Sequence, residues 1–217
     1  MDLVTSSGWG PAIAGAAGLG WGYIADRIGA RWPVHHDREV RGRDWRTVCV
    51  VVLAGAGFAL LGSRIHSPQL FGLLGVYLGA LTVLLATDLD QRLLPDLITL
   101  PLVALALAVG ILDLNPLVRG EWPQAVVAAV GTPIVLFLLS IPFGAGAIGI
   151  GDLKLMVSVG LIAGWERTVL AVIAAALLSG VVVAVLLVAR RVTMRSFIPF
   201  GPFLIIGSVL GLLAGRP

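Results

Sequence analysis

Two acidic clusters interrupt an otherwise apolar chain, and they hold the residues best suited to chemistry. The first is TDLDQRLLPD, which contains Asp88, Asp90 and Asp96 and separates two long apolar runs. The second is GIGDLK, in which Asp152 opens another apolar segment. Carboxylates near the edge of a membrane are costly when partly buried, so each of them suggests a function.

Asp88 and Asp152 are the pair that we expect to be catalytic. Two carboxylates that approach each other cannot easily both ionise, so one pKa rises and that group stays protonated while the other remains a base. Aspartic-protease chemistry requires this, because one Asp activates a water and the other polarises the scissile carbonyl. Gly149 and Gly151, beside Asp152, would let backbone or substrate approach closely.

The other charged residues of the two clusters have simpler alternatives. Asp90 and Asp96 can each be a solvated loop charge or a helix cap, and Asp96 suits the N-cap of the apolar run that follows. Asp152 can also be only a cap. Lys154 either neutralises a neighbouring Asp or contacts lipid headgroups. We therefore expect these residues, other than Asp152, to support the site rather than to carry the reaction.

The composition of the whole chain predicts a membrane protein. Of its 217 residues, 58% are hydrophobic and 12% are charged, whereas soluble domains carry about 25% charged residues. The apolar runs predict one all-α domain, residues 1–217, a polytopic transmembrane bundle of about eight helices. The expected segments are 8–25, 47–63, 68–87, 97–113, 124–143, 151–164, 167–189 and 199–214.

The distribution of basic residues predicts the orientation of these segments. Alternate gaps, together with Lys154, hold eleven of the 15 Lys and Arg residues, and the opposite gaps hold four. The richer face should be cytoplasmic, which places both acidic clusters at the cytoplasmic edge of the membrane. The net charge of +3 does not indicate nucleic-acid binding, because the basic residues form no single stripe.

No cofactor or metal site is expected. Cys49 is the only cysteine and cannot build a cysteine zinc site by itself, and the adjacent His35 and His36 fit a polar loop. Residues 144–149 match GxGxxG, but they follow a membrane segment and lack a βαβ context. The basic segment 31–46 is too short for a domain and fits a solvated anchor loop near anionic headgroups. We expect Gly75 and Gly79, spaced as GxxxG, to mark close helix packing.

Two other classes of protein remain as alternatives. An ion-coupled transporter would use intramembrane carboxylates, but it needs them near the bilayer midplane, whereas here they cluster at one face. An inactive scaffold for pilus assembly is the second alternative, and the retention of both aspartates argues against it.

The motifs resemble those of bacterial prepilin peptidases, the type IV leader peptidases of the GxGD class of membrane aspartic proteases. The resemblance implies that Asp88 and Asp152 are catalytic, that no cofactor is used, and that the substrates are prepilins or pseudopilins cleaved after a glycine at the cytoplasmic face. It indicates neither the particular substrate nor the oligomeric state. It rests on D-x-D-x-x-x-L-P-D at 88–96, GxGDxK at 149–154 and IPFGP at 198–202.

The N-terminal third departs from the family pattern. Many members carry a cytoplasmic domain with two CxxC pairs, which this sequence lacks, and the 31–46 loop stands in its place. Asp26 stands where the family usually has Asn. From these departures we expect a peptidase without the family's N-methyltransferase activity.

Overall fold

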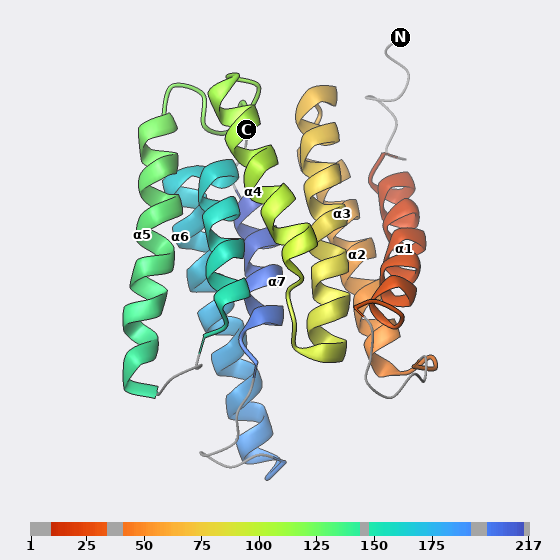
Figure 1. Ribbon diagram of the computed structural model, residues 1–217. Coiled ribbons are helices and arrows are strands. Elements are labelled where there is room, and N and C mark those ends of the chain that lie inside the picture. Colours follow the sequence, from red (N-terminus) through yellow and green to blue (C-terminus); the bar gives the residue numbers. More distant parts are fainter. Residues whose placement is uncertain (1–9, 34–40, 144–147, 192–198, 215–217) are drawn as a thin grey trace. The chain divides into compact units, whose positions relative to one another are not determined.

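The described part of the chain is entirely helical. The computed structural model describes residues 10–33, 41–143, 148–191 and 199–214, and these ranges contain no β-strand. Figure 1 shows the helices in chain order. They are α1 (Gly10–Gly29), α2 (Trp45–Arg64), α3 (Pro68–Gln91), α4 (Asp96–Ile111), α5 (Trp122–Ser140), the short 3-10 helix η1 (Ile141–Phe143), α6 (Ile150–Val188) and α7 (Gly201–Leu212).

The described helices form two compact units. The first contains α1, α2 and α3 and extends to Ile98, and the second runs from Thr99 to Ala214. The first unit brings together the C-terminal end of α1, the N-terminal end of α2 and the C-terminal end of α3. The second unit contains α5, α6 and α7 together with most of α4.

Small residues allow α1 and α2 to pack closely in the first unit. A Cβ atom added at Gly18 would lie 2.7 Å from the Ala54 carbonyl oxygen, and one at Gly22 would lie 2.8 Å from the Val51 Cα. The indole Nε1 of Trp21 donates a hydrogen bond of 3.0 Å to the Gly79 carbonyl, which ties α1 to α3. A Cβ atom added at Gly79 would lie 3.5 Å from the same Trp21 nitrogen, and one at Gly75 would lie 3.9 Å from Leu61 Cδ2. These are ordinary van der Waals distances, so the close helix packing expected at Gly75 and Gly79 is not found.

A break at Gly164 divides α6 into two helices that run in opposite directions (Figure 1). Gly164 has φ 75° and ψ −178°, a conformation that disfavours any residue with a Cβ. The Asn115 side-chain amide donates to the Ile162 carbonyl at 2.8 Å, and the Thr168 hydroxyl donates to the Gly164 carbonyl at 2.6 Å. The Asn115 bond satisfies a carbonyl in the last turn before the break, where intrahelical donors are lacking. The Thr168 bond lies in the first turn after it.

The second unit also depends on glycines at its helix contacts. A Cβ atom added at Gly160 would lie 2.4 Å from the Ala129 backbone nitrogen, so α5 and the first half of α6 are in backbone contact. Gly207 and Gly211 of α7 approach the second half of α6 in the same way, at Ala171. The first half of α6 is almost wholly buried from Leu155 onward.

The exposed surface agrees with a membrane environment. Four described helices, α2, α3, α5 and α6, are long and apolar enough to cross a membrane, and α4 and α7 are shorter apolar helices. Large apolar side chains are exposed along α5, where water would disfavour them and lipid would not. They are Val126, Val127, Val130, Ile134, Val135, Phe137, Leu138 and Leu139.

The predicted all-α, multi-pass bundle of about eight helices is confirmed. Each of the eight expected segments overlaps a described helix, with the expected segments 151–164 and 167–189 corresponding to the two halves of α6. The GxGxxG match and the expected polar loop at His35 and His36 lie largely or wholly outside the described residues.

The close contact at Gly160 predicts a specific effect on stability. Gly160→Ala should lower the free energy of unfolding by about 1–3 kcal/mol, because the new methyl group meets the α5 backbone. Thermal unfolding of the purified protein in detergent measures this. Gly180→Ala is the matched control, because nothing lies within 4 Å of a Cβ at that position of the same element. A Gly160→Ala protein as stable as the control would contradict the packing.

Candidate active site

Asp88 lies in the last turn of α3, and the residue is 5% exposed. The helix ends because Arg92 adopts the left-handed conformation with φ 55°. In this position the Arg92 backbone N–H donates to the Asp88 carbonyl at 2.8 Å. Asp88 is thus a buried carboxylate in the last turn of α3, and its backbone carbonyl accepts the hydrogen bond that caps the helix.

Asp90, the second member of the doublet, is held by two arginines. Its side chain is 4% exposed, and its Oδ1 lies 2.9 Å from Arg41 Nε and 2.9 Å from Arg46 Nη1. Contacts of guanidinium groups with a carboxylate are among the stronger hydrogen-bonded pairs in proteins. Asp90 is therefore neither a solvated loop charge nor a helix cap.

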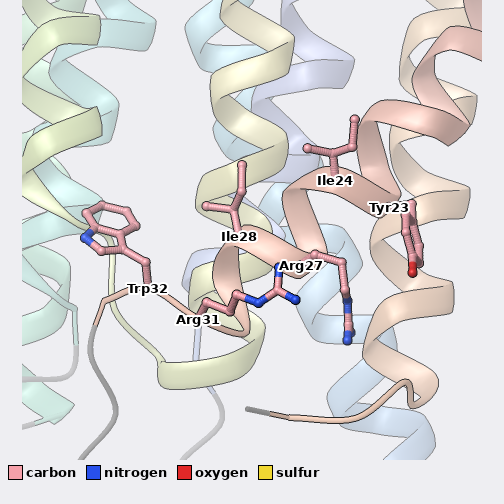
Figure 2. Close-up of a pocket in the computed structure, with 6 residues that line it drawn as sticks. All are labelled: Tyr23, Ile24, Arg27, Ile28, Arg31 and Trp32. Atoms are coloured by element: carbon pink, nitrogen blue, oxygen red, sulfur yellow. The ribbon is translucent and has the colours of Figure 1, made fainter.

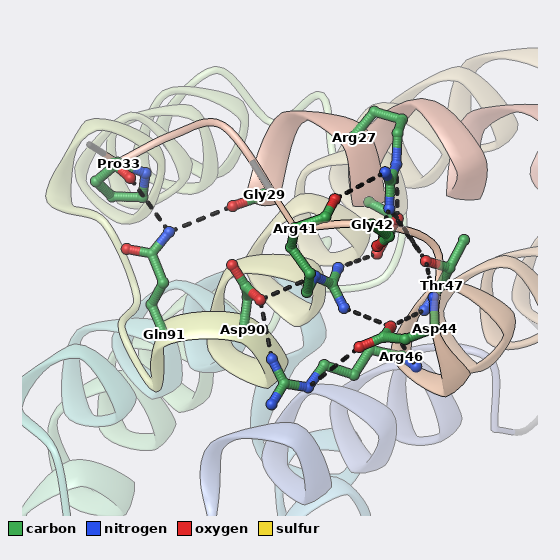
Figure 3. Close-up of polar contacts among 11 residues, drawn as sticks. Arg27, Gly29, Pro33, Arg41, Gly42, Asp44, Arg46, Thr47, Asp90 and Gln91 are labelled. Carbon is green, nitrogen blue, oxygen red and sulfur yellow. Dashed lines mark hydrogen bonds and ion pairs between the residues drawn. The ribbon is translucent and has the colours of Figure 1, made fainter. Parts of the chain in front are cut away.

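These ion pairs belong to a larger set, the Arg41 network, which Figure 3 shows from the side of the loop. Arg41 also pairs with Asp26 of α1 and with Asp44 at 2.7 Å. Asp26, which is fully buried, pairs with Arg27 and accepts a hydrogen bond of 2.9 Å from the Thr47 hydroxyl. The network comprises three carboxylates and three guanidinium groups, so its formal charges balance: Asp26, Asp44, Asp90, Arg27, Arg41 and Arg46.

The network fixes the start of α2 and the chain that leads into it. The Asp44 side chain accepts from the backbone N–H groups of Arg46 and Thr47, and Thr47 completes the capping box. Burial opposes the charged form of Asp44, but the Thr47 N–H and the Arg41 guanidinium outweigh it and hold the pKa of this carboxyl below its ordinary value. Arg27 donates to the carbonyls of Arg41 and Gly42, at 3.2 and 3.3 Å.

An open groove of about 460 Å³ lies beside the network on α1 (Figure 2). Its described walls are apolar and basic. Among the described lining residues there is no carboxylate, Ser or Thr hydroxyl, or thiol. It is lined by Tyr23, Ile24, Arg27, Ile28, Arg31 and Trp32.

Asp152 belongs to the second unit. It lies in the first turn of α6, and it is 8% exposed. Its Oδ2 accepts a hydrogen bond of 3.3 Å from the backbone N–H of Gly149, the residue that precedes the helix. Asp152 thus has the capping contact that we considered as an alternative. A carboxylate has several acceptor positions, so one such bond is compatible with a role in chemistry.

The supporting residues take separate positions around these two aspartates. Gly149 is the N-cap of α6, Gly151 lies in its first turn, and Lys154 is half-buried one turn further on. Asp96 is exposed and is the first residue of α4. We expected it to be the N-cap, which is the position just before the first helical residue. A carboxylate there still interacts favourably with the N-terminal end of the helix dipole.

Each unit by itself places its aspartate at the end that carries basic residues. In the first unit the end of α3 lies with Arg27, Arg41 and Arg46. In the second unit Asp152 begins the helix that also contains Lys154. Within the described residues, no three His, Cys, Asp or Glu side chains are grouped so that they could hold a metal ion.

Comparison with known proteins identifies the family. The sequence profile of the type IV leader peptidase family matches residues 75–185, which include both Asp88 and Asp152. The chain belongs to the type IV leader peptidase family. The prediction from the three motifs is therefore confirmed, and the matched region covers the ends of α3 and α6 that carry the two aspartates.

Several curated relatives extend this match beyond the profile. The chain is 32% identical over 165 residues to the prepilin leader peptidase/N-methyltransferase of Burkholderia pseudomallei strain K96243, covering 76% of this chain and 52% of that protein. It is 35% identical over 178 residues to the protein of the same name from Dickeya chrysanthemi, covering 78% and 60%. The chain thus spans about half the length of the curated relatives that it matches. No solved structure matches the chain.

Reasoning from the sequence missed the Arg41 network. We expected the 31–46 loop to be solvated near lipid headgroups, but its described end, from Arg41 onward, bonds to α1 and α3. Asp26, noted only as a departure from the family pattern, is a central member of the network. The signal in the sequence was that acidic residues, Asp26 and Asp44 among them, are interspersed with the arginines of this region.

The buried position of Asp26 predicts a large cost of removing it. Asp26→Ala should lower the free energy of unfolding by about 3–5 kcal/mol, because it leaves the Arg27 and Arg41 charges uncompensated. Thermal unfolding in detergent is the measurement. The control is Asp113→Ala, which breaks an exposed pair with Arg119 and should cost less than about 1 kcal/mol. Equal losses in the two variants would show that the network contributes little.

Proposed function

We propose that this chain is a membrane aspartic endopeptidase that removes the leader peptide from type IV prepilins or pseudopilins, cleaving after a glycine. Family membership supports the reaction class. The observation that carries the site assignment is that each of the two acidic family motifs contains a buried carboxylate near a helix end, Asp88 on α3 and Asp152 on α6.

The contacts of Asp90 support the choice of Asp88 within the doublet. Asp90 Oδ1 lies 2.9 Å from Arg41 Nε and 2.9 Å from Arg46 Nη1, so the Asp90 side chain joins α3 to the loop and to α2. These contacts give Asp90 a structural role, and we therefore choose Asp88 as the partner of Asp152.

In the proposed reaction, Asp88 and Asp152 hold a water between them. One carboxylate, ionised, takes a proton from the water as the water attacks the carbonyl carbon of the leader glycine. The other, protonated, donates a hydrogen bond to the carbonyl oxygen and stabilises the charge that develops there. The tetrahedral gem-diol then collapses, the C–N bond breaks, and the amine leaves with a proton from a carboxyl group.

The location of the reaction follows from the topology that we propose. Basic residues accompany each aspartate within its own unit, and basic loops face the cytoplasm. Helices that cross the bilayer alternately would bring the end of α3 and the start of α6 to the same face. We place the active site at the cytoplasmic face of the bacterial inner membrane, where the leader would lie with its apolar helix in the lipid.

We propose the peptidase reaction without N-methylation. The names of the curated relatives join both activities, but the sequence contains a single cysteine and no CxxC pair. Substrate identity and methylation can be read in one experiment, because removal of the leader and addition of a methyl group change the mass of the pilin differently.

The experiment is co-expression with candidate prepilins and mass spectrometry of the pilin. Asp88→Asn and Asp152→Asn should each reduce leader removal by at least about 100-fold, because each loses a group that transfers protons. Asp113→Asn is the matched control, since Asp113 is exposed and pairs with Arg119. Both inactive variants should still insert into the membrane. Undiminished cleavage by either of them would refute the catalytic assignment.

A further inference from the structure

The last turn of α3 is held on both sides of Asp88. On the N-terminal side, Gly29 of α1 packs so closely that an added Cβ would lie 3.1 Å from the Ala86 backbone and 3.2 Å from the Thr87 nitrogen. On the C-terminal side, Asp90 is bound by Arg41 and Arg46. This short stretch of helix therefore has little freedom to shift along α1.

Gln91 adds a second contact on the C-terminal side. Its side-chain amide donates to the Gly29 carbonyl at 3.3 Å and to the Pro33 carbonyl at 3.2 Å (Figure 3). These bonds join the last residue of α3 to the C-terminal end of α1. The end of α3 is thus attached to α1 through Gln91 and to the loop and α2 through Asp90.

Helix geometry links the direction of Asp90 to that of Asp88. Successive residues in an α-helix are rotated by about 100°, so residues two apart point in directions about 200° from each other. Holding Asp90 against the arginines therefore fixes the rotation of the helix and turns Asp88 toward roughly the opposite side. A carboxylate that must meet a second carboxylate and a water depends on this rotation, because a small misplacement lowers the rate steeply.

We propose that Arg41 and Arg46 are positioning residues for catalysis, and that they act through Asp90 to hold Asp88 at its working orientation. This inference rests on the proposed function, since it assumes that Asp88 takes part in the reaction. It assigns to the end of the basic loop a role in the turnover of prepilin substrates. Neither arginine needs to touch the substrate for this role.

The least disruptive test is Arg46→Gln, which removes one of the two contacts to Asp90 from a side chain that is 32% exposed. Leader cleavage of a purified prepilin should show kcat lowered by about tenfold to 100-fold, with KM changed by less than about twofold. Arg46→Lys, which keeps the positive charge, should recover most of the rate. A purely structural role would lower the amount of folded enzyme and leave the kcat of the folded fraction unchanged.

Arg43→Gln is the matched control from the same loop. Arg43 donates to the Tyr23 hydroxyl at 2.8 Å and lies over the Tyr23 ring, and it is not a member of the Arg41 network. Its replacement should leave kcat within about twofold of the unchanged protein. Amide hydrogen exchange of residues 86–91 should be faster in Arg46→Gln than in Arg43→Gln, because only the former loosens the end of α3.

The outcomes separate this inference from the proposed function. If Asp88→Asn cleaves normally, both fail. If Asp88→Asn is inactive while Arg46→Gln and Asp90→Asn keep kcat and the exchange rates of residues 86–91, only the positioning role is overturned. It is also overturned if Arg43→Gln lowers kcat as much as Arg46→Gln. If Asp90→Asn does not fold, the kcat and the exchange rates of Arg46→Gln alone decide whether the positioning role holds.

Discussion

Compensation of buried charge is the constraint on which the first unit depends. The Arg41 guanidinium contacts three carboxylates, on α1, before α2 and on α3, and so joins three helices that otherwise meet mainly through apolar and small residues. Ions removed from water are tolerated only when they are paired and hydrogen-bonded. Because the network balances its formal charges, it can lie at the end of an apolar helix bundle.

Backbone proximity is the corresponding constraint in the second unit. Gly160 lets α5 approach the first half of α6, while Gly207 and Gly211 let α7 approach the second half. The reversal at Gly164 requires a positive φ, and Asn115 satisfies the Ile162 carbonyl just before it. The first half of α6, which carries Asp152, is therefore held at its far end by the Asn115 hydrogen bond and along its length by close packing with α5.

The helices and the family could be predicted from the sequence because apolar runs and motifs are both properties of short stretches of chain. Apolar runs define membrane segments, and the polar residues after Gly164 indicated the division of α6. The contacts of Asp90 were not predictable, because Arg41 and Arg46 lie more than forty positions away and no spacing rule connects them. The GxxxG spacing of Gly75 and Gly79 predicted close packing that is not found, because only side chains approach these glycines, at ordinary van der Waals distances. The pairing of Asp88 with Asp152 also depends on distant parts of the chain, and it remains a proposal.

The approach of Asp88 to Asp152 is the central claim, and cross-linking in membranes tests it most directly. Because Cys49 is the only cysteine, a Cys49→Ser background allows cysteines to be introduced at positions 88 and 152 and oxidised or joined by a short bismaleimide, with and without a prepilin. The account predicts an intramolecular 88–152 cross-link, identified by mass spectrometry. It predicts no cross-link between cysteines at positions 152 and 64, because Arg64 lies at the opposite end of α2 from the Arg41 network. Failure of the 88–152 pair to cross-link, with or without the prepilin, would contradict the account.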